Sequence, residues 1–194
     1  MDKVNIRYQT FDELLSLFEC ETEDDEFYEH IAFNLVRKNR DSLDALIPTF
    51  SNKKLCAVLD AMKAAIDIDI DIMQGCLEHS DPNVVATAVD NLRRLGAGRW
   101  LIIGPLIKHP KARVRRAVIR FAYARLGAAS KPLLLDCLKD SNASVRAEIF
   151  EQLIHIAAAI TEQDLEIIKP HLKDKNGSVK VTIDILMKNI KLLS

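Results

Sequence analysis

The sequence predicts an all-α fold built from helical hairpins that stack side by side. Three observations support this prediction. Apolar residues recur at spacings of three and four, glycine and proline number six each in 194 residues, and similar segments return about every thirty residues. Such a period is typical of a solenoid, in which each unit buries its apolar face against its neighbours. We therefore expect one domain that spans residues 1–194.

Residues 1–40 are expected to form a helical cap at the start of the stack. Thr10 followed by Glu13 is a capping-box pattern ahead of an apolar stretch. A second helix is predicted from the helical spacing of four apolar side chains, Phe27, Ile31, Leu35 and Val36. The acidic run at 19–26 lies between these helices, and the sequence leaves open whether it belongs to the cap or forms a second binding surface.

Residues 41–68 are expected to form a degenerate repeat, and the stretch that follows it permits several interpretations. Residues 66–72 read IDIDIDI, and such strict alternation can indicate a half-buried strand. Acidic residues in and after this stretch also fall in the frame of a calcium-binding loop, but Ile72 occupies the position where that loop needs glycine. We expect instead a seam between two helices, with Asp67 or Asp69 capping the second helix.

Four clear hairpins follow, at 69–97, 98–127, 130–158 and 162–192. In each hairpin an aliphatic residue stands seven positions before a valine, in the pairs Leu77/Val84, Ile107/Val114, Leu138/Val145 and Leu172/Val179. An apolar helical face precedes each aliphatic residue and another follows each valine. The predicted core of the first helices is Ile70, Met73, Leu77, Trp100, Ile103, Ile107, Leu134, Leu138, Leu165, Ile168 and Leu172. Each unit is therefore expected to be a helix, a short polar turn and a second helix.

These units resemble HEAT repeats, in the short variety first associated with phycobilisome lyases. The resemblance is carried by the turn DPNV, by the pairs Val114-Arg115 and Val145-Arg146, and by the helix endings Leu95-Gly96 and Leu126-Gly127. It covers about residues 69–191 and implies a right-handed α-α superhelix of about four hairpins beyond the N-terminal cap. Solenoids of this kind serve many purposes, so the resemblance concerns the fold more than the function.

The resemblance also implies a ladder between repeats, made by an aspartate of each turn and an arginine of the second helix. It assigns Asp140 with Arg146 and Asp174 with Lys180 to this ladder. The ladder is expected to be incomplete in the first two repeats, where His109 stands beside Arg115 and Val85 follows Asp81.

The composition and the charge distribution limit which classes of protein the sequence can represent. The net charge is -1, but the charges are segregated: residues 1–50 carry -7, whereas residues 98–130 hold eight basic residues and no acidic one. A near-zero total argues against a dedicated nucleic-acid binder and leaves one local basic block to explain. No apolar run is long enough to cross a membrane, and the first residues lack a signal-peptide core, so we expect no membrane partner.

The cysteines and histidines predict no metal site and no cofactor. The four cysteines, Cys20, Cys56, Cys76 and Cys137, have no ligand spacing and lie in apolar helical patterns, which favours a reducing, cytoplasmic location. His79 and His109 occupy the same repeat position at the end of a first helix, where we expect each to act as a cation on the helix dipole. No catalytic dyad or phosphate-binding glycine loop is found, so we expect a protein that is not an enzyme.

The most informative stretch is the second helix of the second repeat, KARVRRAVIRFAYAR. With the valine side facing the core, Arg113, Arg116, Arg120 and Tyr123 fall together on the opposite face. Arginine and tyrosine are typical anchors of interfaces, and guanidinium groups suit phosphates and carboxylates. We expect this face to line the concave side of the superhelix and to bind a partner.

Two of these arginines are expected to differ. Arg120 stands level with Asp90 and Glu151 of the adjacent repeats, so it can be an ion-paired strut between repeats as well as a ligand contact. Arg116 stands level with two alanines, and we expect it to be unpaired and accessible. The sequence thus predicts a non-catalytic adaptor or inhibitor, for example a toxin-neutralising immunity protein, that grips an acidic protein surface. The alternatives are a nucleic-acid-binding protein that uses the basic helix within 99–125, and a lyase-type enzyme.

Overall fold

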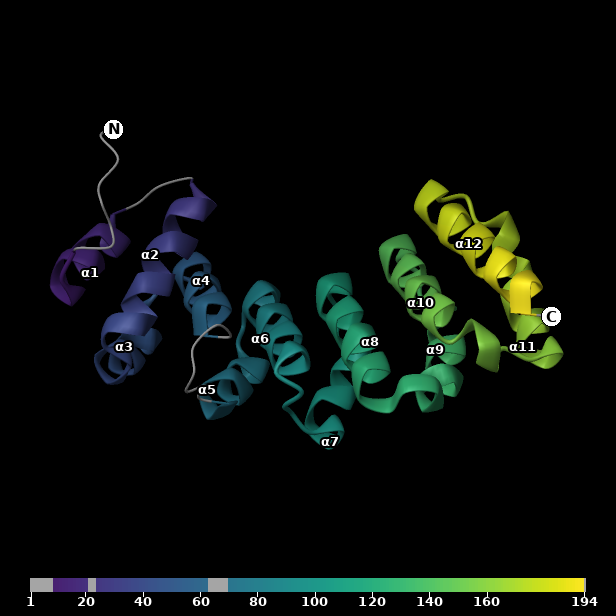
Figure 1. The fold of residues 1–194 in the computed structure, drawn as a ribbon, viewed down its shortest axis with the longest axis horizontal. Helices are drawn as coiled ribbons and strands as arrows, with labels where there is room; N and C mark the ends of the chain where they lie inside the picture. The colour runs from purple at the N-terminus through teal and green to yellow at the C-terminus, as the bar shows by residue number, and fades with distance from the viewer. Residues whose placement is uncertain (1–8, 21–23, 63–69, 194) are drawn as a thin grey trace. The chain divides into compact units, whose positions relative to one another are not determined.

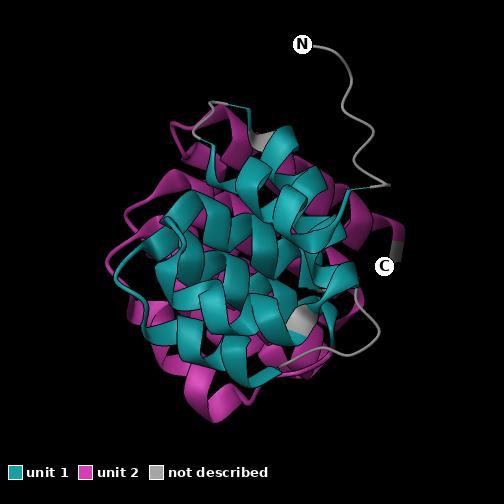
Figure 2. Ribbon diagram, turned by 90° about the vertical axis from the view of Figure 1, so that its left-hand side faces the viewer, with its two compact units in different colours: residues 1–95 teal, residues 96–194 magenta. Residues whose placement is uncertain are grey.

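The computed structural model describes residues 9–20, 24–62 and 70–193, and the regular elements in these ranges are all helices (Figure 1). The predicted all-α class is therefore confirmed for this part of the chain. Residues 63–69, with Asp67, Asp69 and most of the alternating stretch, lie outside the described residues. The chain divides into two compact units, Met1–Leu95 and Gly96–Ser194 (Figure 2), and each is described by itself. The single domain expected over 1–194 stays a prediction.

In its described residues the first unit contains six α-helices. Their bounds are α1 Phe11–Glu19, α2 Asp25–Lys38, α3 Arg40–Leu46, α4 Asn52–Met62, α5 Ile70–Gly75 and α6 Pro82–Arg94. The second helices α2, α4 and α6 pack against one another in chain order, and α1 and α5 pack against α2 and α6. The predicted capping box is present, because the Thr10 hydroxyl accepts from the Glu13 amide while the Glu13 carboxylate accepts from the Thr10 amide. Met73 and Leu77 are buried as expected.

Two predicted core residues are exposed instead. Ile70 of α5 is 38% exposed. Leu172 is 43% exposed and lies in the 3₁₀ segment Lys169–Lys173, which contains Pro170 near its start. Because this segment turns by about 120° per residue rather than 100°, the spacing that buries Ile168 does not carry Leu172 to the same side.

The second unit is a row of three longer helices with shorter helices on one side. Its elements are α7 Trp100–Ile103, α8 Ala112–Leu126, α9 Lys131–Cys137, α10 Ala143–His155, α11 Glu162–Ile168 and α12 Gly177–Leu193. α10 lies between α8 and α12 and packs against both, while α9 packs against α10 and α11 (Figure 1). The apolar positions predicted after the repeat valines of α8, α10 and α12 form the core, with Val114, Val118, Phe121, Ile149, Leu153, Val179, Ile183 and Leu186 among them fully buried.

Neighbouring hairpins of this unit are joined by two ion pairs at the turns, which we call the turn links. Arg115 of α8 donates from Nε and Nη2 to the two oxygens of Asp140, at 2.6 and 2.8 Å, and Arg146 of α10 donates from Nε to Asp174 at 2.8 Å. Each arginine also donates from Nη1 to two backbone carbonyls of its own turn. The ladder assigned to Asp140 with Arg146 was therefore one repeat out of register, because each arginine reaches forward to the next turn.

Two histidines occupy turn positions equivalent to those of Asp140 and Asp174. His79 and His109 accept at Nδ1 from the backbone amide two residues on, at 3.0 and 3.1 Å. Asp140 and Asp174 do the same through Oδ1. The predicted role of both histidines as cations on the helix dipole stays a prediction. The imidazole replaces the aspartate carboxylate in closing the turn.

Candidate functional site

The site is built on α8, which is held in place by the apolar side that it turns toward the core. Val114, Val118 and Phe121 are fully buried, and Phe121 stacks on Trp100 with ring centroids 6.4 Å apart. The helix ends at Gly127, whose φ of 53° lies in the left-handed region that glycine adopts without strain. These contacts fix which side of α8 faces solvent.

The side of α8 opposite this core carries the four predicted site residues. Arg113 is exposed, and Arg116, Arg120 and Tyr123 are partly exposed. The structure therefore places Arg113, Arg116, Arg120 and Tyr123 along one exposed side of one helix, and we call these four residues the basic surface. The concave groove expected at this surface stays a prediction.

A buried carboxylate lies beneath the basic surface. Glu148 of α10 is 2% exposed, and its Oε2 accepts from Nη1 of Arg120 at 2.5 Å and from Nη2 and Nε of Arg116 at 3.2 and 3.3 Å. Its other oxygen, Oε1, accepts from Nε2 of Gln152 at 2.9 Å. Both oxygens are thus hydrogen-bonded, as a buried carboxylate requires. We call Arg116, Arg120 and Glu148 the guanidinium cluster.

The guanidinium cluster corrects two expectations. Arg116 was expected to be unpaired because Ala147 stands level with it, but the acid lies one residue further along α10, within reach of the long arginine side chain. Arg120 is a strut between repeats as expected, but on α10 it pairs with Glu148. Glu151, its expected partner there, is exposed. A buried carboxylate needs compensation far more than an exposed one, so Glu148 draws both guanidinium groups.

One signal in the sequence could have identified Glu148. It stands three residues after the repeat valine, where the other hairpins have Thr87, Ala117 and Thr182. These three residues are all small, as a buried position between packed helices requires. A glutamate at such a position has to be ion-paired, and the arginines of α8 are the nearest basic side chains in the adjacent hairpin.

The exposed parts of the guanidinium cluster are its arginines. The side chain of Arg116 is 40% exposed and that of Arg120 is 25% exposed. Arg116 uses Nε and Nη2 on Glu148, and its Nη1 has no hydrogen-bond partner among the described residues. Arg113 likewise forms no ion pair with a described residue. The basic surface therefore presents donors to solvent while the balancing carboxylate stays below them.

Tyr123 and His155 close one end of this surface. Their rings stack with centroids 5.3 Å apart and planes 21° from parallel, and His155 is exposed. This contact joins two helices, because Tyr123 belongs to α8 and His155 to α10. A stacked pair of this kind offers a flat, rigid edge with polar tips, which suits an interface.

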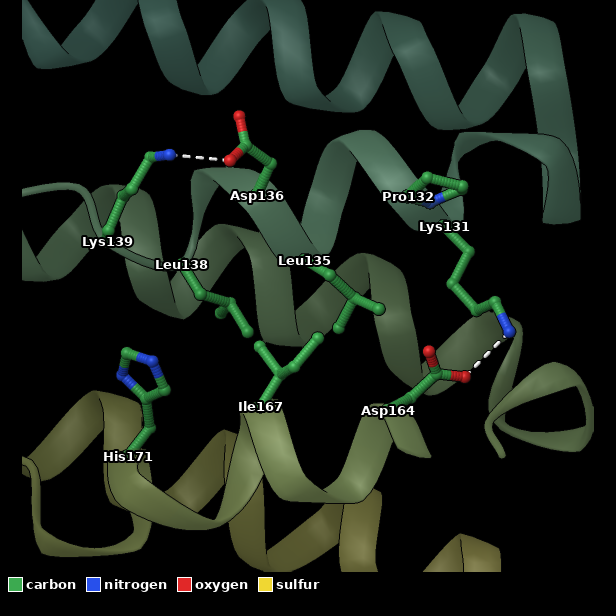
Figure 3. Close-up of a pocket in the computed structure, with 9 residues that line it drawn as sticks. All are labelled: Lys131, Pro132, Leu135, Asp136, Leu138, Lys139, Asp164, Ile167 and His171. Carbon is green, nitrogen blue, oxygen red and sulfur yellow. Dashed lines mark hydrogen bonds and ion pairs between the residues drawn. The ribbon is translucent and has the colours of Figure 1, made fainter. Parts of the chain in front are cut away.

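A hollow of about 540 Å³ lies elsewhere in the second unit, between α9 and α11 (Figure 3). Leu135, Leu138 and Ile167 meet at its centre, and Lys131 pairs with Asp164 across one end at 2.6 Å. The pKa of Asp164 is lowered, because burial, which alone would raise it, is outweighed by hydrogen bonds from Lys131 and Thr161. Sequence reasoning did not find this hollow, since its lining residues come from two short helices with no shared motif.

Among residues 9–20, 24–62 and 70–193, no three histidine, cysteine, aspartate or glutamate side chains come together as candidate ligands. The four cysteines are free. No helix in these ranges has both the length and the apolar character that a membrane crossing needs.

Comparisons with known proteins bear on the fold alone. No protein-family model and no curated protein matches the sequence. Three similar solved structures are engineered proteins of the Northeast Structural Genomics Consortium. The first is 17% identical with a TM-score of 0.55, over 95% of this chain and 97% of that chain. The second is 18% identical with a TM-score of 0.56, over 95% and 99%. The third is 16% identical with a TM-score of 0.53, over 93% and 58%.

Proposed function

We propose that the chain is a non-catalytic protein-binding module, a small HEAT-like adaptor or inhibitor that grips an acidic surface of another protein. The basic surface of α8 makes the contact, with Arg113 and Arg116 binding carboxylates and Tyr123 packing beside them. A toxin-neutralising immunity protein is one concrete form of such an inhibitor. The four free cysteines support a reducing, cytosolic location for this function.

The observation that carries the proposal is the guanidinium cluster. A surface arginine normally loses side-chain freedom when it binds, and this loss weakens the interaction. Here Glu148 already holds Arg116 and Arg120 in place from below. The orientation of both guanidinium groups is therefore set before a partner binds. Their exposed N–H groups can then donate to carboxylates of the partner.

The proposal includes the finer architecture that the HEAT resemblance implies. We infer a right-handed α-α superhelix in which α8, α10 and α12 line the inner side. Two observations within the second unit support this inference, namely the common register of the buried valines Val114, Val145 and Val179 and the turn links, which repeat from one hairpin to the next.

A pull-down from native lysate with quantitative mass spectrometry tests the proposal. The full chain is immobilised as wild type, as the double variant Arg113→Glu/Arg116→Gln, and as the control Arg99→Glu. Glutamine at 116 can still donate to Glu148, so the fold is preserved. Arg99 is exposed and lies in the same basic block, so its reversal makes a comparable change of charge. We expect the double variant to lose a partner that wild type and the control retain; equal recovery from all three would contradict the proposal.

Nucleic-acid binding is a second candidate function, and the same three proteins test it. Arg115, Arg116 and Arg120 are paired with carboxylates of the second unit, which removes much of the positive charge that the basic block of 98–130 suggests. We therefore expect no retention of DNA or RNA at low salt in a filter-binding assay. Retention that Arg113→Glu/Arg116→Gln abolishes and Arg99→Glu spares would identify the basic surface as a nucleic-acid site instead.

A further inference from the structure

The basic surface is one end of a longer exposed face that runs across α8, α10 and α12. Arg116, Ala147 and Val181 each follow their repeat valine by two positions, and Arg120, Glu151 and Ile185 follow it by six. Of these six residues Ala147 is buried and the other five are partly or fully exposed. Because α10 packs against both α8 and α12, equivalent positions lie on the same side of the three helices. We call this exposed side of α8, α10 and α12 the B face.

The B face changes character along this row. Its α8 end carries Arg113 and Arg116, whereas its α12 end carries Val181 and Ile185, which are 59% and 42% exposed. Leu192 lies about two helical turns after Ile185 on the same side of α12 and is also exposed. The α8 end is thus cationic, whereas the α12 end combines exposed aliphatic side chains with the exposed Lys188, which lies on the same side of the helix between Ile185 and Leu192.

The apolar end of the B face is not the side of α12 on which a further hairpin would pack. That side is marked by the fifth position after the repeat valine, where Ile119 and Phe150 are fully buried and Phe150 contacts His171 of the next hairpin. In α12 the fifth position is Asp184, which is exposed and charged. The packing side of α12 is therefore polar, and the exposed aliphatic residues are confined to the B face.

From this arrangement we infer that the partner docks through an acidic amphipathic helix that crosses the B face, with carboxylates over α8 and bulky apolar side chains over α12. The inference rests on the proposed function and specifies its partner. Three packed helices place the two ends about 16–20 Å apart, since neighbouring axes lie about 8–10 Å apart. A helix of about 11–13 residues spans that distance.

A protein segment fits this face better than a membrane surface does. Membrane-binding faces place basic residues along both flanks of one apolar stripe. On the B face the arginines lie two helices away from the exposed aliphatic residues, and the exposed acids Glu151 and Asp184 stand closer to those residues than the arginines do. Charge complementarity therefore favours a ligand that is acidic at one end and apolar at the other.

The test uses a phage-displayed library of random 16-residue peptides selected on the full chain. We expect enriched peptides to carry aspartate or glutamate at one end and leucine, isoleucine or phenylalanine about three helical turns away. A fluorescent synthetic copy of an enriched peptide is then titrated by anisotropy against variants of the full chain. Ile185→Asp should weaken binding by about tenfold or more, because it places a charge against the apolar end.

Ile167→Asp is the matched control. Ile167 is 48% exposed, much like Ile185, but it lines the hollow between α9 and α11. We expect this control to leave peptide binding unchanged, and thermal unfolding to be the same for both aspartate variants within a few degrees. Val181→Thr, which keeps the side-chain shape, should weaken binding in the same direction as Ile185→Asp, by a smaller factor.

The outcomes separate this inference from the proposed function. If Arg113→Glu weakens peptide binding and Ile185→Asp does not, the apolar end is no part of the site and the inference is wrong, while the proposed function stands. If neither variant weakens it, or no peptide is enriched, both are contradicted. Co-sedimentation of the chain with vesicles of phosphatidylcholine and phosphatidylserine, lost in Ile185→Asp, would overturn the inference in favour of a membrane surface.

Discussion

The turn links and the guanidinium cluster are both arginine–carboxylate contacts between adjacent hairpins, yet they differ in which groups face solvent. In the link of Arg115 to Asp140 both side chains are largely buried, 14% and 13% exposed. In the guanidinium cluster the carboxylate of Glu148 is buried while Arg116 is 40% exposed. The comparison shows that an arginine–carboxylate pair can have two different roles. A pair buried on both sides holds hairpins together, and a pair buried on one side orients a donor outward.

The largest effect on stability is expected from breaking a turn link. Arg115→Ala leaves Asp140 without its bidentate partner and two turn carbonyls without a donor, so the free energy of unfolding should fall by about 3 kcal/mol. Urea denaturation of the purified chain measures this. Arg113→Ala, on the same helix but exposed, is the control and should change it by less than about 0.5 kcal/mol. An equal loss of unfolding free energy in the two variants would show that the buried turn link contributes no more stability than the exposed Arg113.

A smaller loss is expected from the guanidinium cluster. Glu148→Ala removes the buried carboxylate, but the two arginines left behind can turn toward water, so we expect unfolding to become easier by about 1–2 kcal/mol. The same variant should weaken capture of the partner, because Arg116 and Arg120 lose their fixed orientation. Glu151→Ala, which removes an exposed acid from the same helix, should leave the free energy of unfolding near the wild-type value.

Acid should act on the turn links through their aspartates. Burial opposes ionisation of Asp140 and Asp174, but hydrogen bonds from Arg115 to Asp140, and from the Asn176 amide and Arg146 to Asp174, outweigh it and hold both pKa values below the ordinary range. A lowered folded-state pKa gives stability that is present above the unfolded pKa near 3.9 and lost as pH falls through the folded value. The stability difference between wild type and Arg115→Ala should therefore shrink below about pH 4. A difference that stays constant down to pH 2 would show that the links contribute no charge-dependent stability.

The smallest effect on stability, and a clear effect on binding, is expected from Arg113→Glu. Arg113 is exposed and forms no ion pair with a described residue, so thermal unfolding should be unchanged. Partner affinity should fall by about tenfold, since the reversal places a like charge opposite the partner's carboxylates. Surface plasmon resonance with the captured partner measures both rates. Arg116→Glu is a poorer test, because a second carboxylate beside buried Glu148 would itself destabilise the fold.

The sequence predicted the parts of the fold that depend on periodic burial. The repeat valines and the apolar positions after them are core residues because a hairpin can bury one side of each helix, and that side repeats every three to four residues. The periodicity fails at Leu172, which lies in a 3₁₀ segment that contains Pro170, and at Ile70, which is exposed. The failure at Leu172 has a local backbone cause, because a 3₁₀ segment does not follow the residue spacing of an α-helix.

The candidate site was predicted in position but not in pairing. The side of α8 follows from the core stripe, so Arg113, Arg116, Arg120 and Tyr123 fall where expected. The partner of Arg116 depends on how far a flexible side chain extends toward the next helix. A comparison of equivalent positions in successive repeats does not show how far a side chain extends. The forward direction of the turn links was missed for the same reason.

Oxidative footprinting of the full chain, alone and with the partner recovered by pull-down, tests the central claim most directly, because it reads individual side chains. We predict that the partner protects Tyr123, His155 and Ile185 on the B face, while Ile167 and His171 at the hollow between α9 and α11 stay as reactive as in the free chain. Protection of Ile167 and His171, with Tyr123 and His155 unchanged, would contradict the account.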